Sequence, residues 1–557
     1  MPDLARRILL LFLTLLTAAV VSVPAQAQKT GTKYYEDSEN GFKFKPLKDW
    51  ENIPVRDGMK GAGVIARFSG GKSISVKTPA NTFMQAEVDL YIFRFDQPQA
   101  VTGSEGGGLR DRVGGEAKRP QIEEIIPRMF DFRDFKEEGM TKPIQEIEMK
   151  KLKKGLEARH ATWWANAADG FQIFLDAWTV RMDQYDIVWL YVLPDQRKDN
   201  KKYYKAFESS LKSVQVVETT EAVAAVGQDG SYEEQLNYHK AENEKVAGWT
   251  AIPTPSKKYI IATSSDDKKF IEEVIERLEK SRDIFEIDFP PTKEMTHVSV
   301  VRICASKDEF SKYGGTEDED VGYFNPGSTE LVLYDSKNTD RRATLAVMSH
   351  EAFHQYCHFL FDQSEAHRWF DEGHGDWYGA YEFKGKKAIP TAHMPGRLDR
   401  FQGIKTLVRE ERYKPIWVHI NYDHQRWDDQ GPRNTSCYEQ SWSIIYFLRR
   451  GTDGDVPKKV WKKEYADIIP SYMATLHEGF QREYEKLRKL LREERAKLNP
   501  ETDSELIEIL DHRIAHPSVG EDTKQKIWED AMAASWGQVD IEEFEKNWVM
   551  YINDYLK

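Results

Sequence analysis

The apolar and polar positions of the chain follow two different periods, and each period predicts one kind of element. In the first third of the chain, short runs rich in apolar, β-branched and aromatic residues predict strands at 39–46, 62–68, 72–78, 86–95, 159–167, 171–180 and 186–194. Residues 201–215 change to a helical period and predict a closing helix. These elements indicate one sheet-and-helix domain over residues 33–217.

The rest of the chain is expected to form a second domain over residues 245–557, joined to the first by a linker over residues 218–244. The pattern predicts a helix, a strand, a short helix and a second strand, at 267–285, 297–306, 307–315 and 328–335. The residues that follow are mostly of helical period. The predicted fold class is therefore α+β, with a mostly helical second domain that starts with a small sheet.

Composition and charge narrow the possible partners. With 557 residues, 40% of them hydrophobic, the chain can bury more than one core. Its formal net charge is -13 and its pI is about 5.7. These values argue against nucleic acid or an anionic membrane as the main partner.

The N-terminus has the features of an export signal over residues 1–27. Two arginines at positions 6 and 7 precede the apolar stretch 8–21, and residues 25–27 read Ala-Gln-Ala, a small-x-small cleavage site. A retained anchor is the alternative, and Pro24 with the alanine-rich ending favours cleavage. The mature protein is expected to be secreted or periplasmic, without stable membrane insertion.

Three cysteines, Cys304, Cys357 and Cys437, allow at most one disulfide bridge. A disulfide framework is therefore excluded, although exported proteins often have one. We expect Cys357 to be a small buried apolar residue.

The segment TLAVMSHEAFHQYCHFLF contains the most specific chemical pattern in the chain. His350 and His354 are four residues apart, so on a helix they share a face and can bind one zinc ion. Glu351 beside them can reach a metal-bound water as a general base. The surrounding apolar spacing is helical, so the pattern lies on the element that it requires.

A catalytic zinc needs a third protein ligand, and Glu372 stands 18 residues after His354 (372 − 354) in the run HRWFDEGHGDWYGAYEF. Asp376 follows one helical turn later and could accept the outer N–H of a ligand histidine. Three further histidines near this site, at positions 358, 367 and 374, are expected to be ordinary surface or hydrogen-bonded residues rather than extra ligands.

The HExxH motif followed by W-x-x-E-G resembles the gluzincin metallopeptidases, in particular the peptidase-MA-like branch. Trp369, Glu372 and Gly373 match that pattern as they stand, and Gly375 replaces the alanine usual there. A metzincin would need a histidine six residues after His354, where this chain has Leu360. The resemblance implies zinc bound by His350, His354 and Glu372, with a peptide or protein as substrate.

The resemblance also implies two further features of the site. The strand STELVLYD, residues 328–335, would be the sheet edge to which an extended peptide adds, although an ordinary edge strand would have the same sequence pattern. Tyr438, in the segment CYEQSWSIIYFLRR, would donate to the developing oxyanion. The alternative for Tyr438 is a locally bonded tyrosine on a buried helix.

The first domain resembles the PsbP/Mog1-like fold in its opening NGFKFKPLKDWE and its ending AFESSLKSVQ. That resemblance carries no catalytic signature. The sequence thus supports a secreted zinc peptidase, and the alternative is a secreted binding or structural protein on a gluzincin scaffold that no longer cleaves.

Overall fold

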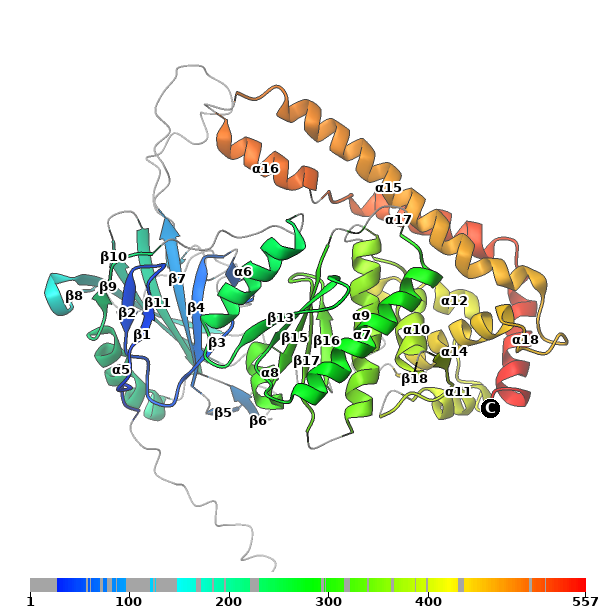
Figure 1. The fold of residues 1–557 in the computed structure, drawn as a ribbon, viewed down its shortest axis with the longest axis horizontal. Coiled ribbons are helices and arrows are strands. Elements are labelled where there is room, and N and C mark those ends of the chain that lie inside the picture. The colour runs from blue at the N-terminus through cyan, green and yellow to red at the C-terminus, as the bar shows by residue number, and fades with distance from the viewer. Residues whose placement is uncertain are drawn as a thin grey trace, which may run out of the picture. The chain divides into compact units, whose positions relative to one another are not determined.

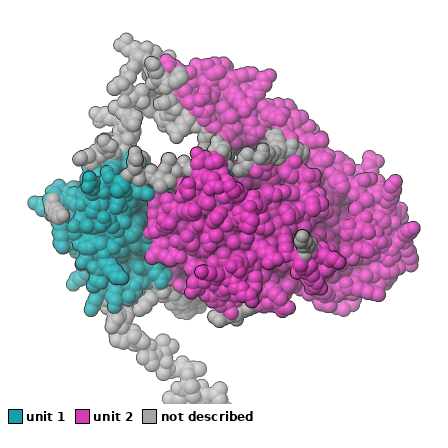
Figure 2. Space-filling view, in the orientation of Figure 1, with its two compact units in different colours: residues 1–55, 59–222 teal, residues 56–58, 223–557 magenta. Residues whose placement is uncertain are grey.

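The computed structural model describes residues 28–557 except for short gaps and two longer ones. The residues outside the description are 57–58, 61, 71–73, 78–82, 87, 97–120, 124–125, 127–147, 167–171, 183–184, 195–196, 221–229, 292–294, 296, 315–320, 338–339, 362–364, 386, 397–398, 429–434, 500–502 and 516. The predicted signal peptide therefore lies outside the described residues. The chain divides into two compact units, residues 1–55 with 59–222, and residues 56–58 with 223–557 (Figure 2).

Unit 1 is built on a seven-stranded sheet, with neighbours in the order β3-β4-β7-β11-β10-β9-β8, every pair antiparallel. Its elements are β1 (Tyr35–Asp37), β2 (Phe42–Phe44), β3 (Glu51–Ile53), β4 (Val64–Ser69), β5 (Ile74–Lys77), β6 (Phe83–Ala86), β7 (Asp89–Asp96), β8 (Glu148–Lys151), β9 (Glu157–Asn166), β10 (Gln172–Arg181), β11 (Tyr185–Pro194), α5 (Arg197–Leu211) and β12 (Gln215–Val216). The helix α5 packs its Phe207 ring on Tyr191 of β11, with ring centroids 3.8 Å apart. The strands and the closing helix predicted for this region are thus present.

The sheet of unit 2, of which Figure 1 labels β13, β15, β16 and β17, has the order β13-β14-β15-β17-β16. Its strands are β13 (Thr250–Pro253), β14 (Tyr259–Thr263), β15 (Ser299–Cys304), β16 (Gly322–Asn325) and β17 (Glu330–Tyr334). The three central strands run parallel, and β13 and β16 pair antiparallel at the two ends. All five residues of β17 are buried.

The prediction that residues 328–335 form an edge strand is wrong. β17 pairs with β15 on one side and with β16 on the other, so β16 is the edge. The reversal between these strands is a tight turn in which the Asn325 side chain accepts the backbone N–H groups of Gly327 and Ser328. Such an Asx-type turn lets the chain fold back on itself as a hairpin.

Residues 232–244, placed in the linker by the sequence pattern, form helix α6 (Tyr232–Glu244). A capping box starts this helix, because the Ser231 hydroxyl accepts the Glu234 N–H and the Glu234 carboxylate accepts the Ser231 N–H. Leu236 anchors it to the sheet in a small cluster with Ala251 and Ile260. The second unit therefore begins before residue 245.

Helices make up most of the rest of unit 2. They are α7 (Lys268–Asp288), α8 (Lys307–Tyr313), α9 (Arg341–Leu360), α10 (Arg368–Gly379), α11 (Phe401–Arg409), α12 (Ile416–Ile420), α13 (His424–Asp428), α14 (Thr435–Thr452), α15 (Ile468–Arg495), α16 (Ser504–Ala515), α17 (Glu521–Trp536) and α18 (Ile541–Asp554), with a small hairpin of β18 (Tyr381–Lys384) and β19 (Lys387–Pro390). The expected combination of helices and several sheets is confirmed.

Helix α10 packs against α9 and α14, and two glycines allow the close approach. A Cβ on Gly373 would lie 2.8 Å from the backbone oxygen of Ser441 in α14. A Cβ on Gly375 would lie 2.8 Å from the ring of His350 in α9. Both distances are shorter than an ordinary contact between heavy atoms, so these positions keep α10 pressed between its neighbours.

The three cysteines are buried and free. Among the described residues, no helix combines the length and apolarity that crossing a bilayer requires.

Candidate metal centre

The first two candidate ligands lie on α9, which begins at an Asp340 cap whose carboxylate accepts the Arg342 N–H. Most residues of this helix are buried between the sheet and α10. His350 and His354 are one turn apart on one face, with ring centroids separated by 4.6 Å. The helix therefore presents both imidazoles in the same direction.

The third candidate ligand, Glu372, comes from α10 and lies between the two rings. Its Oε2 is 3.2 Å from His350 Nε2 and 3.5 Å from His354 Nε2. The three ligand atoms all lie within 4.8 Å of one another. The structure thus brings together the three residues that the sequence proposed as metal ligands.

The charges of this cluster are strongly coupled. Burial by itself would raise the pKa of Glu372, but the two imidazoles outweigh it and hold that pKa well below its usual range. Burial alone would lower the pKa of His350, but Asp376 and Glu372 raise it to about 9. A buried carboxylate facing two imidazole nitrogens is a strong site for a proton or for a metal cation.

Asp376 takes the position that the sequence proposed for it. Its Oδ1 lies 3.1 Å from Nδ1 of His350, so Nδ1–H is donated there and Nε2 is left to bind a metal. The other carboxylate oxygen accepts a 2.7 Å hydrogen bond from Nε of Arg400. Arg400 is itself buried and precedes α11.

Two residues that the sequence reasoning missed complete this shell of charges. Asp371 Oδ1 lies 2.9 Å from Nδ1 of His354, within ion-pair distance although the two atoms are not aligned as a hydrogen bond. Arg368 donates a 3.1 Å hydrogen bond to the second oxygen of Glu372. Both histidines therefore have a carboxylate near their outer nitrogen, an arrangement that in metal sites orients the ligand ring.

Glu351, the proposed base, is half-buried beside the cluster. Burial raises the pKa of its carboxyl group above the ordinary value. Its Oε2 accepts a 2.9 Å hydrogen bond from the backbone N–H of Phe324 in β16. The edge strand of the sheet therefore directly contacts the proposed base, which the sequence pattern did not indicate.

Tyr438 lies in the first turn of α14 and faces the same cluster. The guanidinium of Arg400 lies over its ring at 4.9 Å, and Trp427 packs against the ring at 5.3 Å. The nearby charge of Glu372, together with burial, raises the pKa of the Tyr438 hydroxyl. The hydroxyl thus remains protonated near the three candidate ligands.

The other three histidines are not grouped with the ligands. His374 donates Nδ1–H to the backbone oxygen of Phe370 at 2.7 Å, and its ring packs among aromatic side chains. His358 packs against Phe324, and burial lowers its pKa to about 4. His367 contacts Tyr472 at the start of α10.

No known protein-family model matches this chain, and no curated protein matches it in sequence. Among solved structures it is similar to the cyanobacterial PsbP protein (CyanoP) of Synechocystis sp. PCC 6803, with 14% identity over 33% of this chain and 91% of that chain and a TM-score of 0.21. It is also similar to a crystal structure of a protein from Bacteroides thetaiotaomicron, with 10% identity over 66% of this chain and 88% of that chain and a TM-score of 0.18. Scores this low do not establish a shared fold for either match.

Proposed function

We propose that this protein is an exported zinc-dependent peptidase of gluzincin type. The observation that carries the proposal is the convergence of His350, His354 and Glu372, whose ligand atoms lie within 4.8 Å of one another. Two imidazoles and one carboxylate are the donor set of a catalytic zinc site, which leaves the remaining position for water. The carboxylates at the outer nitrogens of both histidines support the same reading.

When bound, zinc would lower the pKa of a coordinated water toward 7 and polarise the scissile carbonyl. Glu351 then has the position to take the proton of that water and to deliver it to the leaving amine. Its raised pKa, caused by burial, suits a group that must both accept and return a proton near neutral pH. The Tyr438 hydroxyl would donate to the oxygen that becomes negatively charged.

The edge strand β16 is the element that would bind the substrate. Among the described residues no strand pairs with its outer side, which could pair with an extended peptide through main-chain N–H and C=O groups. The hydrogen bond from Phe324 N–H to Glu351 places this edge directly beside the proposed base. The substrate class that fits is therefore an extended polypeptide.

The remaining parts of the proposal rest on sequence resemblance. The first unit would be a PsbP/Mog1-like module that positions or recognises the substrate, and the export signal would deliver the protein to the periplasm or the medium. The negative net charge of -13 agrees with a protein or peptide partner rather than a nucleic acid.

The test compares wild type with Glu351→Gln, and with Glu382→Gln, an exposed acid on β18, as the matched control. Each purified protein is analysed for zinc and then incubated with a library of peptides whose cleavage is read by mass spectrometry. We expect equal zinc in all three and cleavage by wild type and the control only, since the glutamine keeps the shape of Glu351 but cannot accept a proton.

His354→Ala should in contrast lose the metal along with the cleavage. Cleavage by Glu351→Gln at the rate of wild type would refute the assignment of the base. Zinc in all three proteins without cleavage of any peptide would favour the second candidate, a binding protein on the same scaffold.

A further inference from the structure

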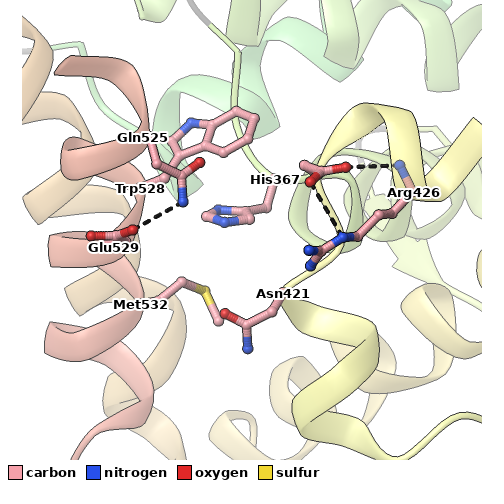
Figure 3. Close-up of a pocket in the computed structure, with 8 residues that line it drawn as sticks. His367, Asn421, Arg426, Gln525, Trp528, Glu529 and Met532 are labelled. Carbon is pink, nitrogen blue, oxygen red and sulfur yellow. Dashed lines mark hydrogen bonds and ion pairs between the residues drawn. The ribbon is translucent and has the colours of Figure 1, made fainter. Parts of the chain in front are cut away.

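A pocket of unit 2 that none of the candidate ligands lines has a volume of about 230 Å³ (Figure 3). One wall is α17, the opposite wall is the connection from α12 into α13, and His367 before α10 forms part of the floor. The volume admits a molecule the size of one ring, whereas pockets for drug-sized ligands measure about 300–1,000 Å³.

The floor of the pocket consists of buried side chains, namely His367, Trp528 and Met532, with His367 only 5% exposed. The Trp528 indole N–H donates to the backbone oxygen of Glu365 at 2.9 Å, so its ring offers carbon surface to the pocket. His367 packs on this ring with centroids 4.5 Å apart. The floor is therefore aromatic and apolar except for the imidazole.

The hydrogen bonds of Tyr472 determine which nitrogen of His367 carries the proton. The Tyr472 oxygen accepts the backbone N–H of His367 at 2.9 Å and lies 2.8 Å from Nδ1. Among the described residues, the acceptor within reach of the buried Tyr472 hydroxyl proton is Nδ1 of His367. Leaving that proton without an acceptor would cost about 1–3 kcal/mol. Tyr472 therefore donates to Nδ1, and the neutral ring carries its hydrogen on Nε2.

Nε2–H of His367 has no hydrogen-bond partner in the part of the chain that the structure describes. Burial lowers the pKa of His367 to about 3, so the ring stays neutral at physiological pH. The pocket thus offers one neutral donor at its floor, where a ligand oxygen can accept it.

The rim carries groups that are already paired with each other. Asp423 accepts the backbone N–H of Arg426 at 2.7 Å and lies 3.6 Å from its guanidinium, and Gln525 donates to Glu529 at 3.1 Å (Figure 3). Asn421 completes the rim. The formal charges of Arg426, Asp423 and Glu529 sum to −1, which disfavours an anion, and the N–H at the floor disfavours a cation there.

We propose that this pocket binds a neutral polyhydroxylated ring, such as one sugar unit. A hydroxyl oxygen can accept from His367 at the floor, while other hydroxyl groups donate to the carboxylate and amide oxygens of the rim. The apolar C–H face of the ring packs on Trp528 and Met532. This site is independent of the proposed peptidase chemistry and needs no metal.

The test is saturation-transfer NMR and calorimetric titration of the full-length protein with methyl glucoside, methyl galactoside and N-acetylglucosamine. Acetate and ethylamine serve as an anion and a cation probe of similar polarity. We expect saturable binding of at least one sugar, unchanged after treatment with a chelator, and no binding of either ion.

The variants His367→Phe, which keeps an aromatic ring but removes the N–H, and Asn421→Ala, at the rim, should each weaken that binding by about threefold to tenfold or more. Trp417→Phe, at an exposed tryptophan outside the pocket, is the matched control and should bind as wild type does. The rim variant keeps the test valid if the floor variant fails to fold.

Absence of saturable sugar binding, binding of acetate or ethylamine in its place, or equal sugar binding by both pocket variants and wild type would overturn the proposal. Loss of sugar binding on removal of metal would move the ligand to the zinc site and overturn it as well.

Discussion

The substitution Gly375→Ala tests whether the packing of α10 sets the position of a metal ligand. The added Cβ would lie 2.8 Å from Cε1 and 2.9 Å from both nitrogens of the His350 ring. Carbon atoms rest at about 3.5–4.0 Å, so the ring or the helix must move by about 0.7–1.2 Å. A zinc–nitrogen bond tolerates only about 0.2 Å, so the displaced ring should bind the metal poorly.

The expected loss of zinc affinity is about tenfold to a hundredfold, the range found when the surroundings of a ligand are disturbed. Folding stability should change less, because overpacking costs about 1–3 kcal/mol while replacing a helical glycine with alanine returns about 1 kcal/mol. Gly373→Ala is the matched control, since its Cβ meets Ser441 and Ile445 of α14 rather than a ligand.

The assay is a zinc titration against a competing chelator, with thermal unfolding followed with and without the metal. Gly375→Ala should lose zinc affinity, and Gly373→Ala should lose stability while its zinc affinity stays that of wild type. Equal zinc affinity in all three proteins would show that the ring has room to adjust, contrary to the reasoning.

Three further predictions concern other parts of unit 2. Arg400→Gln removes the cation that holds Asp376, the carboxylate partner of His350, so zinc affinity in the same titration should fall by up to about tenfold. Arg400→Lys should recover part of that affinity. Equal zinc affinities in all three proteins would show that Arg400 contributes to packing alone. Glu330→Gln leaves Arg302 buried without its carboxylate and should lower the free energy of urea unfolding by about 3–5 kcal/mol, whereas Glu233→Gln, at an exposed ion pair, should change it little. Burial lowers the pKa of His419 to about 3, so below about pH 6.5 the unfolded chain binds a proton at this residue more readily than the folded chain does. The free energy of unfolding should therefore fall on acidification, by about 2 kcal/mol from this residue at pH 5. A His419→Gln variant whose free energy of unfolding falls as steeply as that of wild type would contradict this.

Much of the local structure could be predicted from the sequence, because it depends on periods of two or 3.6 residues. The HEAFH segment lies on α9, and Glu372 and Asp376 lie on one face of α10, as their spacing of four residues requires. The motif also indicates that α9 and α10 pack together, since a zinc site on His350 and His354 needs a third ligand such as Glu372.

Long-range pairing could not be predicted in the same way. The edge strand β16 is four residues long and half-buried throughout, so its pattern has no clear alternation, and only its pairing with β17 reveals it. Arg400 precedes α11 in a segment without an apolar period, and its contact with Asp376 spans 24 residues. The position of Asp371 beside His354 could not be predicted either. Adjacent helical residues point about 100° apart, so the sequence gives no reason to place Asp371 near the same cluster as Glu372.

In the proposed enzyme, the hydrogen bond between Phe324 and Glu351 would couple substrate binding to the release of the base. A polypeptide that pairs with the outer side of β16 would have to take over the outward N–H groups of that strand, and the N–H of Phe324 is donated to the Glu351 carboxylate. Binding of a polypeptide substrate would therefore release the Glu351 carboxylate when it has to accept the proton of the attacking water. Solvent molecules, or short peptides that do not reach this strand, would leave Glu351 hydrogen-bonded to Phe324, and the proposed enzyme would then have little activity.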